Sequence, residues 1–266
     1  MKTAVITGSS RGLGLEMAKC FRKCGMNVVL NGANQNRLKK AQQTLESIPS
    51  DGKILAFSAN VTSSKDIQAL IDKTIAEFGA IDIWINNAGV NQPMKPLWEL
   101  SEGEIEQILD VDLKGSIIGS KLAMEQMIRQ GHGAIYNLEG YGSNDAMMLG
   151  LNMYGTGKRA VTHFTQALAR ESEELKTGVL VGRLSPGIMI TDFITTALGD
   201  KEKIDLPEKT KRFYNIVGDY PDVVADYLVT KILKNTKNNV HIQWLTTGKL
   251  MRKFMSAGFN KRDFFA

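Results

Sequence analysis

The sequence is poor in the residues that mark disulfide-rich, collagen-like and disordered chains. Its 266 residues include only 2 cysteines and 6 prolines, while 43% of the residues are apolar and 23% are charged. These proportions exclude all three classes and are those of an ordinary folded globular protein. Cys20 and Cys24 lie four residues apart in one expected helix, where a disulfide would constrain almost nothing. We therefore expect two reduced thiols and a cytoplasmic location.

Long apolar runs and a strong excess of one charge are also missing. No uncharged stretch is long enough to cross a bilayer, and the first residues lack the apolar core of a signal peptide. The 33 basic and 28 acidic side chains leave a formal charge of +5, which does not by itself indicate a nucleic-acid partner. We expect no integral membrane segment and no nucleic acid partner.

Short β-rich apolar runs alternate with segments of helical periodicity up to about residue 190. Because the runs are apolar throughout, the strands are expected to be covered on both faces. The alternation predicts a three-layer α/β fold, with a doubly wound parallel sheet, in a single domain over residues 1–266. The expected strands are 3–7, 27–31, 53–59, 81–86, 133–138, 179–184 and 240–245. The expected helices are 13–24, 37–47, 65–78, 104–129, 154–175 and 222–234.

Two parts of the second half are less regular. A variable segment near 190–220 is expected on the substrate side, and it includes a charged stretch at 200–212. The tail, 248–266, mixes basic residues with phenylalanine and methionine at helical spacing. Its apolar stripe could pack on the core, on another subunit or on a membrane surface, and we favour packing on protein.

A glycine-rich turn, GSSRGLG at residues 8–14, separates the first strand from the first helix. In that position backbone N–H groups and the helix N-terminus can meet a pyrophosphate. The alternative is a turn that merely needs flexible residues. The residues of this turn that we expect to contact a dinucleotide are Gly8, Ser10, Arg11, Gly12, Leu13 and Gly14.

The stretch after the second strand decides between the two nicotinamide cofactors. NAD sites usually place a carboxylate there for the ribose hydroxyls, but residues 31–34 read NGAN. Nothing in this stretch would repel a 2′-phosphate, and Arg11 could neutralise one. We therefore favour NADP(H) over NAD(H), with Ala33 and Asn34 in the cofactor site; the alternative for Arg11 is a solvated surface cation.

Tyr154 and Lys158 stand four residues apart at the start of a helix that follows a strand. Residues at this spacing share a helix face, and a neighbouring ammonium favours the phenolate and brings its pKa closer to the operating pH. This pair suits the interconversion of an alcohol and a ketone. The spacing alone is not specific, since Tyr227 and Lys231 repeat it in a later helix that we interpret as ordinary surface.

Four segments, taken together, resemble the short-chain dehydrogenase/reductase family. They are TG…GLG at 7–14, NNAG at 86–89, Tyr154 with Lys158, and SPG at 185–187 followed by Thr191. The resemblance covers about residues 3–192 and implies a seven-stranded Rossmann-type sheet, an NAD(P) cofactor and a homo-oligomer, a dimer or a tetramer. A looser likeness, carried by the loop GYGSNDAMM, is to the branch that includes chlorophyll b reductases.

The resemblance extends the expected cofactor site. In the family the NNAG segment steadies the centre of the sheet, and the Pro-Gly segment lines the nicotinamide. Asn60 falls where family members usually carry an acid near the adenine. The added cofactor residues are Asn60, Val61, Asn87, Ala88, Gly89, Pro186, Gly187, Ile188 and Thr191, with Tyr154 and Lys158; no metal is expected.

Two departures from the family pattern concern catalysis. The family's substrate-orienting serine is replaced by Gly140, and Ser143 is the nearest hydroxyl that could take the role, unless it is simply a turn residue. Asp112 stands where the family usually has asparagine. If that position acts through its main-chain carbonyl the exchange is mild; otherwise the proton relay is altered. The catalytic candidates are Tyr154, Lys158, Ser143 and Asp112.

The expected substrate side is rich in thioethers and aliphatic groups, including Tyr141, Met148, Leu149 and Met189. Such a pocket would accept a bulky lipophilic ketone or secondary alcohol, steroid-like or polycyclic; the alternative is that the methionines form a subunit interface. The sequence thus predicts an NADP(H)-dependent oxidoreductase. A dinucleotide-binding regulatory module on the same fold is the second hypothesis, and a nucleic-acid-binding protein, resting on the charge alone, is the third.

Overall fold

The computed structural model describes residues 1–189, 208–257 and 262–264, and their centre is a seven-stranded sheet. All neighbouring strands run parallel, in the order β3-β2-β1-β4-β5-β6-β7. The strands are β1 (Thr3–Ile6), β2 (Asn27–Asn31), β3 (Ile54–Phe57), β4 (Ile83–Asn86), β5 (Gly133–Leu138), β6 (Val179–Ser185) and β7 (Val240–Gln243). The predicted doubly wound parallel sheet is confirmed.

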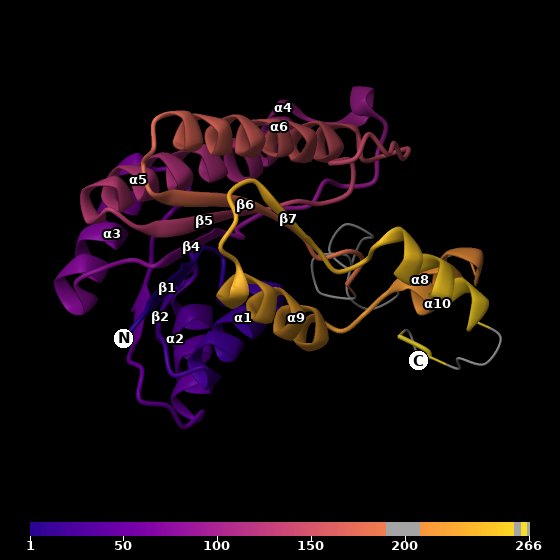
Figure 1. The fold of residues 1–266 in the computed structure, drawn as a ribbon. Helices are drawn as coiled ribbons and strands as arrows, with labels where there is room; N and C mark the ends of the chain where they lie inside the picture. Colours follow the sequence, from indigo (N-terminus) through magenta and orange to yellow (C-terminus); the bar gives the residue numbers. More distant parts are fainter. Residues whose placement is uncertain (190–207, 258–261, 265–266) are drawn as a thin grey trace.

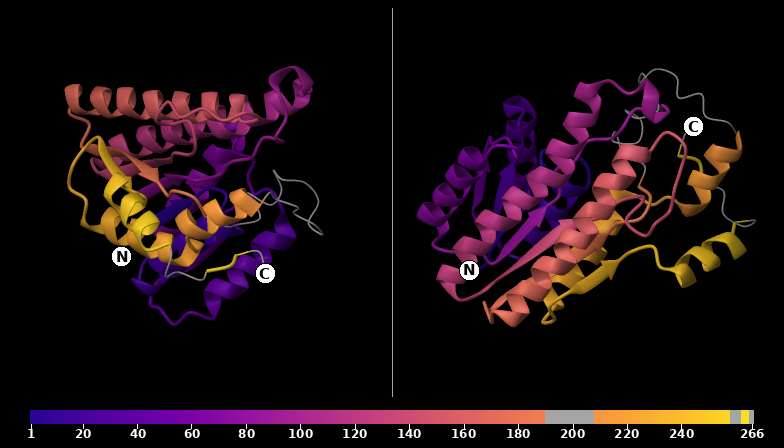
Figure 2. Two further views of the ribbon diagram at one scale, coloured as in Figure 1. Left: turned by 90° about the vertical axis from the view of Figure 1, so that its right-hand side faces the viewer. Right: turned by 90° about the horizontal axis from the view of Figure 1, so that it is seen from above.

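Helices cover both faces of the sheet and make the three predicted layers (Figures 1 and 2). One face packs against α1 (Gly12–Lys23), α2 (Gln35–Glu46) and α9 (Pro221–Lys234). The other packs against α3 (Ser64–Phe78), α5 (Gly115–Gln130) and α6 (Asn152–Glu174). The central strands are buried on both sides, which is why their sequences are apolar throughout rather than alternating.

The expected helix at 104–129 is interrupted. It consists of α4 (Glu102–Ile108), a π-helical segment η2 (Leu109–Lys114) and α5. A π segment widens the helix locally and is common at functional sites. Here it contains the fully buried Asp112, whose Oδ1 accepts the N–H of Val90 at 2.7 Å. Periodicity cannot predict this break, because the partner comes from the loop after β4.

Polar side chains clamp the middle of the sheet. Asn86 Nδ2 donates to Asn137 Oδ1 at 2.7 Å and to Ser120 Oγ at 2.9 Å. Asn137 in turn donates to Thr165 Oγ1 at 2.9 Å, on α6. Each buried amide is therefore satisfied by a neighbour from another element. The clamp fixes α5 and α6 against the ends of β4 and β5.

Three shorter elements complete the described chain: η1 (Leu97–Glu99), α8 (Glu208–Val217) and α10 (Thr247–Met255). α8 and α10 lie beyond the carboxyl edge of the sheet (Figure 1). Both cysteines are free thiols, as expected, and burial raises the pKa of Cys20 to about 11. No helix in the described ranges is long and apolar enough to span a bilayer.

Candidate active site

The glycine turn between β1 and α1 has the backbone conformation that glycine permits. Gly8 and Gly12 have φ values of +63° and +57°, which L side chains rarely adopt. A methyl group on Gly14 would overlap Asn87, whereas the space beside Gly12 is open. The N-terminus of α1 carries no side-chain cap, so its N–H groups suit an anionic ligand. The turn therefore fits a dinucleotide pyrophosphate.

The NNAG segment is bonded to this turn. Asn87 Nδ2 donates to the carbonyl oxygens of Thr7 and Gly8, at 2.9 and 3.1 Å. The Thr7 hydroxyl accepts the N–H groups of Asn87 and Ala88, at 3.0 and 3.1 Å. Gly89 lies beside the carboxylate of Asp112. The segment thus connects the phosphate-binding turn to the residues around Tyr154.

The end of β2 carries no acid. Asn31 is buried and donates to the carbonyl oxygen of Ala59 at 3.0 Å. Asn34 caps α2 by accepting the Arg37 N–H at 2.9 Å, and Ala33 is exposed beside it. Arg11 is exposed on the neighbouring turn, where it could meet a 2′-phosphate.

The two predicted residues after β3 lie at the same sheet edge. Asn60 is exposed, and its N–H donates to Asp66 at 3.0 Å, so an acid does occur here, six residues later than the family pattern implies. Val61 is buried against Gly115 at the start of α5. Neither side chain contacts the Tyr154 group; their place suits the adenine end of a cofactor.

Tyr154 and Lys158 share one buried face of α6. Their side chains are buried, and the Lys158 Nζ atom lies 5.6 Å from the centroid of the Tyr154 ring. The start of α6 is capped by Gln92, whose Oε1 accepts the Tyr154 N–H at 3.0 Å. Gln92 is fully buried, and its Nε2 has no hydrogen-bond partner within the described part of the chain. The helix begins at residue 152, two residues earlier than predicted.

Asp112 makes a direct ion pair with Lys158, over 3.0 Å between Oδ2 and Nζ. The side chains are 0% and 5% exposed respectively, so water does not screen the pair. The main-chain carbonyl of Asp112 accepts a hydrogen bond from Ser116 instead. The side chain of Asp112 is thus the group that contacts Lys158 here, and which of the two alternatives holds for the proton relay stays a prediction.

The balance of charge and burial favours a protonated phenol and a protonated amine. Burial raises the pKa of Tyr154; Lys158 lowers it, Asp112 raises it again, and the net direction is upward. Burial lowers the pKa of Lys158, but the charge of Asp112 and its hydrogen bond to the amine raise it above its ordinary value. The expectation that Lys158 brings the phenol towards neutral pH is wrong for this structure, because burial and Asp112 outweigh it.

The loop after β5 lies directly on the start of α6. A methyl group on Gly140 would overlap the Tyr154 hydroxyl, and one on Gly142 would overlap Gly155. No side chain, serine included, could stand at position 140 without displacing the phenol. Ser143 is buried, its Oγ accepting the Gly140 N–H at 3.2 Å and lying 3.3 Å from the Lys158 carbonyl oxygen.

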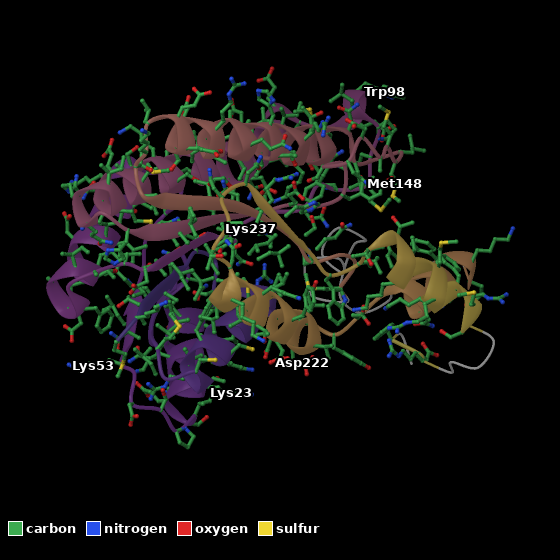
Figure 3. All side chains as sticks on the ribbon, viewed as in Figure 1. Lys23, Lys53, Trp98, Met148, Asp222 and Lys237 are labelled. Atoms are coloured by element: carbon green, nitrogen blue, oxygen red, sulfur yellow. The ribbon has the colours of Figure 1, made fainter. Side chains whose placement is uncertain are left out.

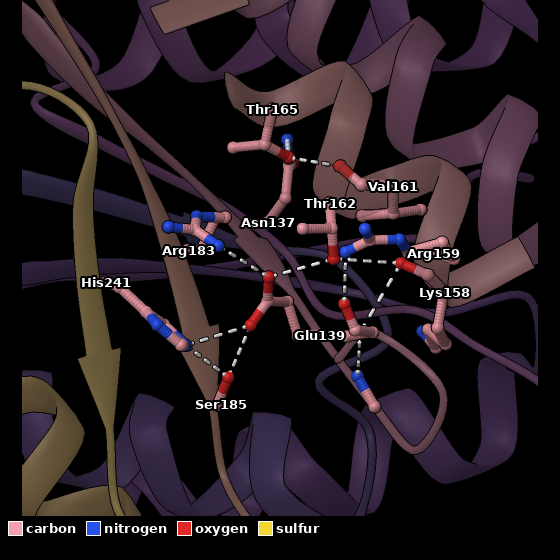
Figure 4. Close-up of polar contacts among 12 residues, drawn as sticks. Asn137, Glu139, Lys158, Arg159, Val161, Thr162, Thr165, Arg183, Ser185 and His241 are labelled. Carbon is pink, nitrogen blue, oxygen red and sulfur yellow. Dashed lines mark hydrogen bonds and ion pairs between the residues drawn. The ribbon is translucent and has the colours of Figure 1, made fainter. Parts of the chain in front are cut away.

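Glu139 forms a buried polar cluster that sequence reasoning missed (Figure 4). Its carboxylate accepts hydrogen bonds from Thr162 at 2.9 Å and from Ser185 at 2.5 Å. Arg183 and His241 pair with it at 3.3 and 3.0 Å. Burial alone would raise the pKa of Glu139, but the hydrogen bonds of His241, Ser185 and Thr162 and the charge of His241 lower it to about 2. The cluster ties α6, β6 and β7 to the residue that precedes Gly140.

This cluster brings together a serine, a histidine and a carboxylate without forming a hydrolytic triad. Ser185 Oγ and Glu139 Oε2 both lie against the same ring nitrogen, Nε2 of His241, at 2.7 and 3.0 Å. A triad needs the two partners on opposite ring nitrogens. The cluster is therefore a structural support for the site.

The segment after β6 reaches the same edge of the sheet. Pro186 is buried, and Gly187 has a φ of +75° with Leu245 packed against it. The carbonyl of Ile188 accepts the Asp219 N–H at 3.1 Å, and Met189 pairs with Asp219 as a parallel bridge. Thr191 lies outside the described residues.

The predicted substrate residues are spread along the rim. Tyr141 and Met189 are half-buried, Met148 is 44% exposed and Leu149 is 81% exposed. Met148 and Trp98 mark this rim in Figure 3. The structure thus brings Tyr154, Lys158, Asp112 and Ser143 together, and leaves Leu149 outside as a rim residue.

Of the two missed residues, Glu139 and Gln92, a signal in the sequence could have found one. Glu139 follows directly on a buried strand at the carboxyl edge, where an acid is unusual unless it is paired. Gln92 gives no such signal, because only the tertiary contact with α6 distinguishes it from any loop glutamine.

Comparison with known proteins places the chain among relatives of one kind. The profile described as short chain dehydrogenase matches residues 2–202. The chain is 29% identical to the probable chlorophyll(ide) b reductase of Arabidopsis thaliana, described as chloroplastic, over 99% of this chain and 54% of that protein. It is 33% identical to a chloroplastic chlorophyll(ide) b reductase of Oryza sativa subsp. japonica, over 95% of this chain and 74% of that protein. The chain therefore spans about half the length of the first relative.

Solved structures share the fold. Levodione reductase superposes with a TM-score of 0.82 at 21% identity, covering 94% of this chain and 98% of that one. A metagenomic short-chain oxidoreductase in complex with NADP gives a TM-score of 0.72 at 20% identity, covering 92% of this chain and 98% of that one. At these identities the likeness shows the fold alone.

The Glu139 cluster predicts a pH-dependent stability. A carboxyl whose pKa falls from its ordinary 4.5 to about 2 on folding stabilises the protein above pH 4.5 and loses that contribution as the pH falls towards 2. Urea unfolding between pH 7 and 3 should show the wild type losing about 1.4 kcal/mol more per pH unit below 4.5 than Glu139→Gln. Glu174→Gln, at an exposed carboxylate paired with Arg170, is the control. Parallel pH curves for wild type and Glu139→Gln would contradict the assignment.

Proposed function

The chain belongs to the short-chain dehydrogenase family, and we propose that it is an NADP(H)-dependent oxidoreductase that interconverts a ketone and a secondary alcohol. The observation that carries the proposal is the buried constellation of Tyr154, Lys158 and Asp112 beside the phosphate-binding edge. Such a group is costly to bury and has no role in packing the sheet. Perturbed titratable groups of this kind gather at sites of proton transfer.

Tyr154 is the proton donor in the direction of reduction. Its raised pKa keeps the hydroxyl protonated at neutral pH, ready to donate to a substrate oxygen. The bound nicotinamide supplies the hydride. Lys158 stays charged beside Asp112 and stabilises the phenolate that forms as the proton leaves. Gln92 accepts the main-chain N–H of Tyr154 and fixes the start of α6, while the backbone at Gly140 lies against the phenolic hydroxyl.

The open glycine turn and the acid-free end of β2 support NADP(H) as the cofactor. Gly8, Ser10, Arg11, Gly12, Leu13 and Gly14 would hold the pyrophosphate and the 2′-phosphate. Asn87, Ala88 and Gly89 would line the ribose side, and Pro186, Gly187 and Ile188 the nicotinamide. One solved neighbour holds NADP, which agrees with this choice.

A bulky lipophilic molecule is the proposed substrate. The rim carries large apolar side chains with high exposure, among them Met147 at 91% and Leu149 at 81%. Thioethers adapt to broad apolar shapes better than to sugars. The two plant relatives are named for chlorophyll(ide) b, which supports a large substrate. That the chain forms a dimer or tetramer, and that it is cytoplasmic, stay predictions.

The second candidate is a dinucleotide-binding module without catalysis. The observation in its favour is that Ser143 bonds to the backbone of the loop and α6, while Gly140 leaves no room for the family's serine. The two candidates differ in whether replacing Tyr154 changes a measurable turnover.

Removal of the phenolic hydroxyl tests the mechanism. Tyr154→Phe should lower NADPH-dependent reduction of polycyclic ketones by about a hundred- to ten-thousandfold, because a positioned general acid is lost. NADPH binding, followed by fluorescence titration, should stay unchanged. Tyr227→Phe is the matched control, since Lys231 Nζ also lies 5.6 Å from its ring. Equal turnover in wild type and Tyr154→Phe would remove Tyr154 from the mechanism, and no turnover in either would favour the binding module.

The ion pair with Asp112 predicts the pH profile. Because the charge of Asp112 raises the pKa of Tyr154, Asp112→Asn should move the falling, alkaline limb of the reduction rate to lower pH. Asp110→Asn, two residues away at an exposed ion pair, should leave the profile in place. An unchanged alkaline limb in Asp112→Asn would show that the carboxylate does not influence the proton donor.

Arg11 predicts the cofactor choice. Arg11→Ala should raise the KM for NADPH about ten- to a hundredfold, because a charged partner of the 2′-phosphate is lost, and should leave the KM for NADH nearly unchanged. Arg170→Ala, on an exposed part of α6, is the control. An equal effect on both cofactors, or none, would contradict NADP(H) specificity through Arg11.

A further inference from the structure

Large apolar side chains are exposed mainly at one end of the molecule. Of the seventeen that are exposed in the described ranges, eleven lie on loops and helices at the carboxyl edge of the sheet. Trp98, on η1, is 83% exposed. The eleven are Met94, Leu97, Trp98, Met147, Met148, Leu149, Phe213, Tyr220, Met251, Phe254 and Met255. Folded monomers rarely expose so many large apolar groups together unless the surface meets something.

α10 presents two faces. Phe254 packs towards α8, with its ring 6.4 Å from that of Phe213. Met251 and Met255, four residues apart and hence on one face, are 62% and 77% exposed. Arg252 is exposed beside them. The stripe therefore packs on the described part of this chain only in part, and what covers its other face stays a prediction.

The excess of basic over acidic residues in this chain lies on α8 and α10. These two helices hold six of the 33 basic residues and one of the 28 acidic residues. Their net charge is +5, which is that of the entire chain, and the other 247 residues carry 27 charges of each sign.

Part of this positive charge is free to meet a partner. Glu208 pairs with Lys211, and Asp219 pairs with Lys253. Lys209, Arg212 and Arg252 are exposed and form no ion pair with any residue the structure describes. Among the described residues, three exposed cations without an ion-pair partner thus lie on the two helices that also carry the exposed Met251 and Met255.

We propose that the face formed by α8 and α10 docks on the surface of an anionic lipid bilayer. Exposed cations attract the lipid headgroups, and exposed methionine and phenylalanine side chains enter the boundary between headgroups and acyl chains. A second copy of this chain fits less well, because a two-fold contact would bring the exposed cations Lys209, Arg212 and Arg252 of both copies together. The protein would bind the bilayer peripherally, through side chains of α8 and α10.

The surface lies at the edge of the sheet that carries Tyr154 (Figure 1). Asp219 joins the two regions, since it accepts hydrogen bonds from Lys253 Nζ and Trp244 Nε1, both at 2.6 Å, and pairs with Met189. Docking at this face would bring the active-site rim towards the lipid, where lipophilic molecules dissolve. The inference does not depend on the proposed function, because docking is measured without turnover.

Vesicle co-sedimentation of the full chain tests the proposal. Binding is expected to vesicles of phosphatidylcholine and phosphatidylglycerol in about equal amounts, to weaken as sodium chloride rises, and to be lost with phosphatidylcholine alone. Arg212→Glu with Arg252→Glu should weaken binding at least about thirtyfold, at roughly 1 kcal/mol for each cation removed. Met251→Ser with Met255→Ser should weaken it about tenfold or more.

Matched variants at other surfaces test whether binding depends on this face, on the net charge of the chain, or on nonspecific hydrophobic adsorption. Lys39→Glu with Lys40→Glu, on the exposed side of α2, makes the same change in charge and should leave binding unchanged. Ile128→Ser with Leu175→Ser, exposed at the opposite edge, is the apolar counterpart. Equal loss in the α2 variant, equal binding to neutral vesicles, or no binding by the wild type would each overturn the proposal. So would an oligomer in solution that dissociates in the Met251 and Met255 variant, since this result assigns the face to a second copy.

Discussion

The buried ion pair between Asp112 and Lys158 is the constraint around which the carboxyl edge is arranged. A buried pair is not a stabilising device in itself, because the loss of hydration of two charges offsets their attraction. This pair is further held by the Val90 N–H on Asp112 and by a helix that widens to let the carboxylate reach inward. Removing either partner would leave an uncompensated buried charge. The loop after β4, the π segment and α6 therefore cannot shift independently, and the position of Tyr154 is fixed as a consequence.

The same two residue types at the same spacing do different things in this chain. Lys158 and Lys231 each lie 5.6 Å from the ring of the tyrosine four residues earlier. Lys231 is exposed to water, which screens its charge. Lys158 is buried against a carboxylate, so its charge acts on Tyr154 at close range in a poor dielectric. The two tyrosine–lysine pairs therefore have the same spacing and differ only in the burial and charge of the groups around them.

The sequence predicts those structural features that depend on neighbouring residues or on a periodic pattern of residues. Apolar runs mark the strands because both faces of a parallel sheet are covered. Gly8 and Gly12 mark a turn with positive φ, which other residues rarely adopt, and Gly14 marks a close approach of Asn87. The break at 109–114 was missed because its cause, the Val90 N–H, belongs to another segment. The Glu139 cluster was missed for the same reason, since its partners come from α6, β6 and β7. Periodicity reports which face is buried, and it carries no information about which distant polar groups meet there.

The two ends of the molecule differ in the side chains that they expose, because all strands of the sheet run parallel. Every strand delivers its following loop to the carboxyl edge, so that this edge collects side chains which the core does not constrain. Tyr154, the apolar rim and the charged helices α8 and α10 all lie there, while the rest of the chain has equal numbers of acidic and basic residues. Asp219, buried and bonded to Lys253 as well as to the backbone of Ile188, ties α10 to the segment that follows β6. One buried carboxylate therefore connects α10 to the backbone at the carboxyl edge of the sheet, beside the segment that follows β6.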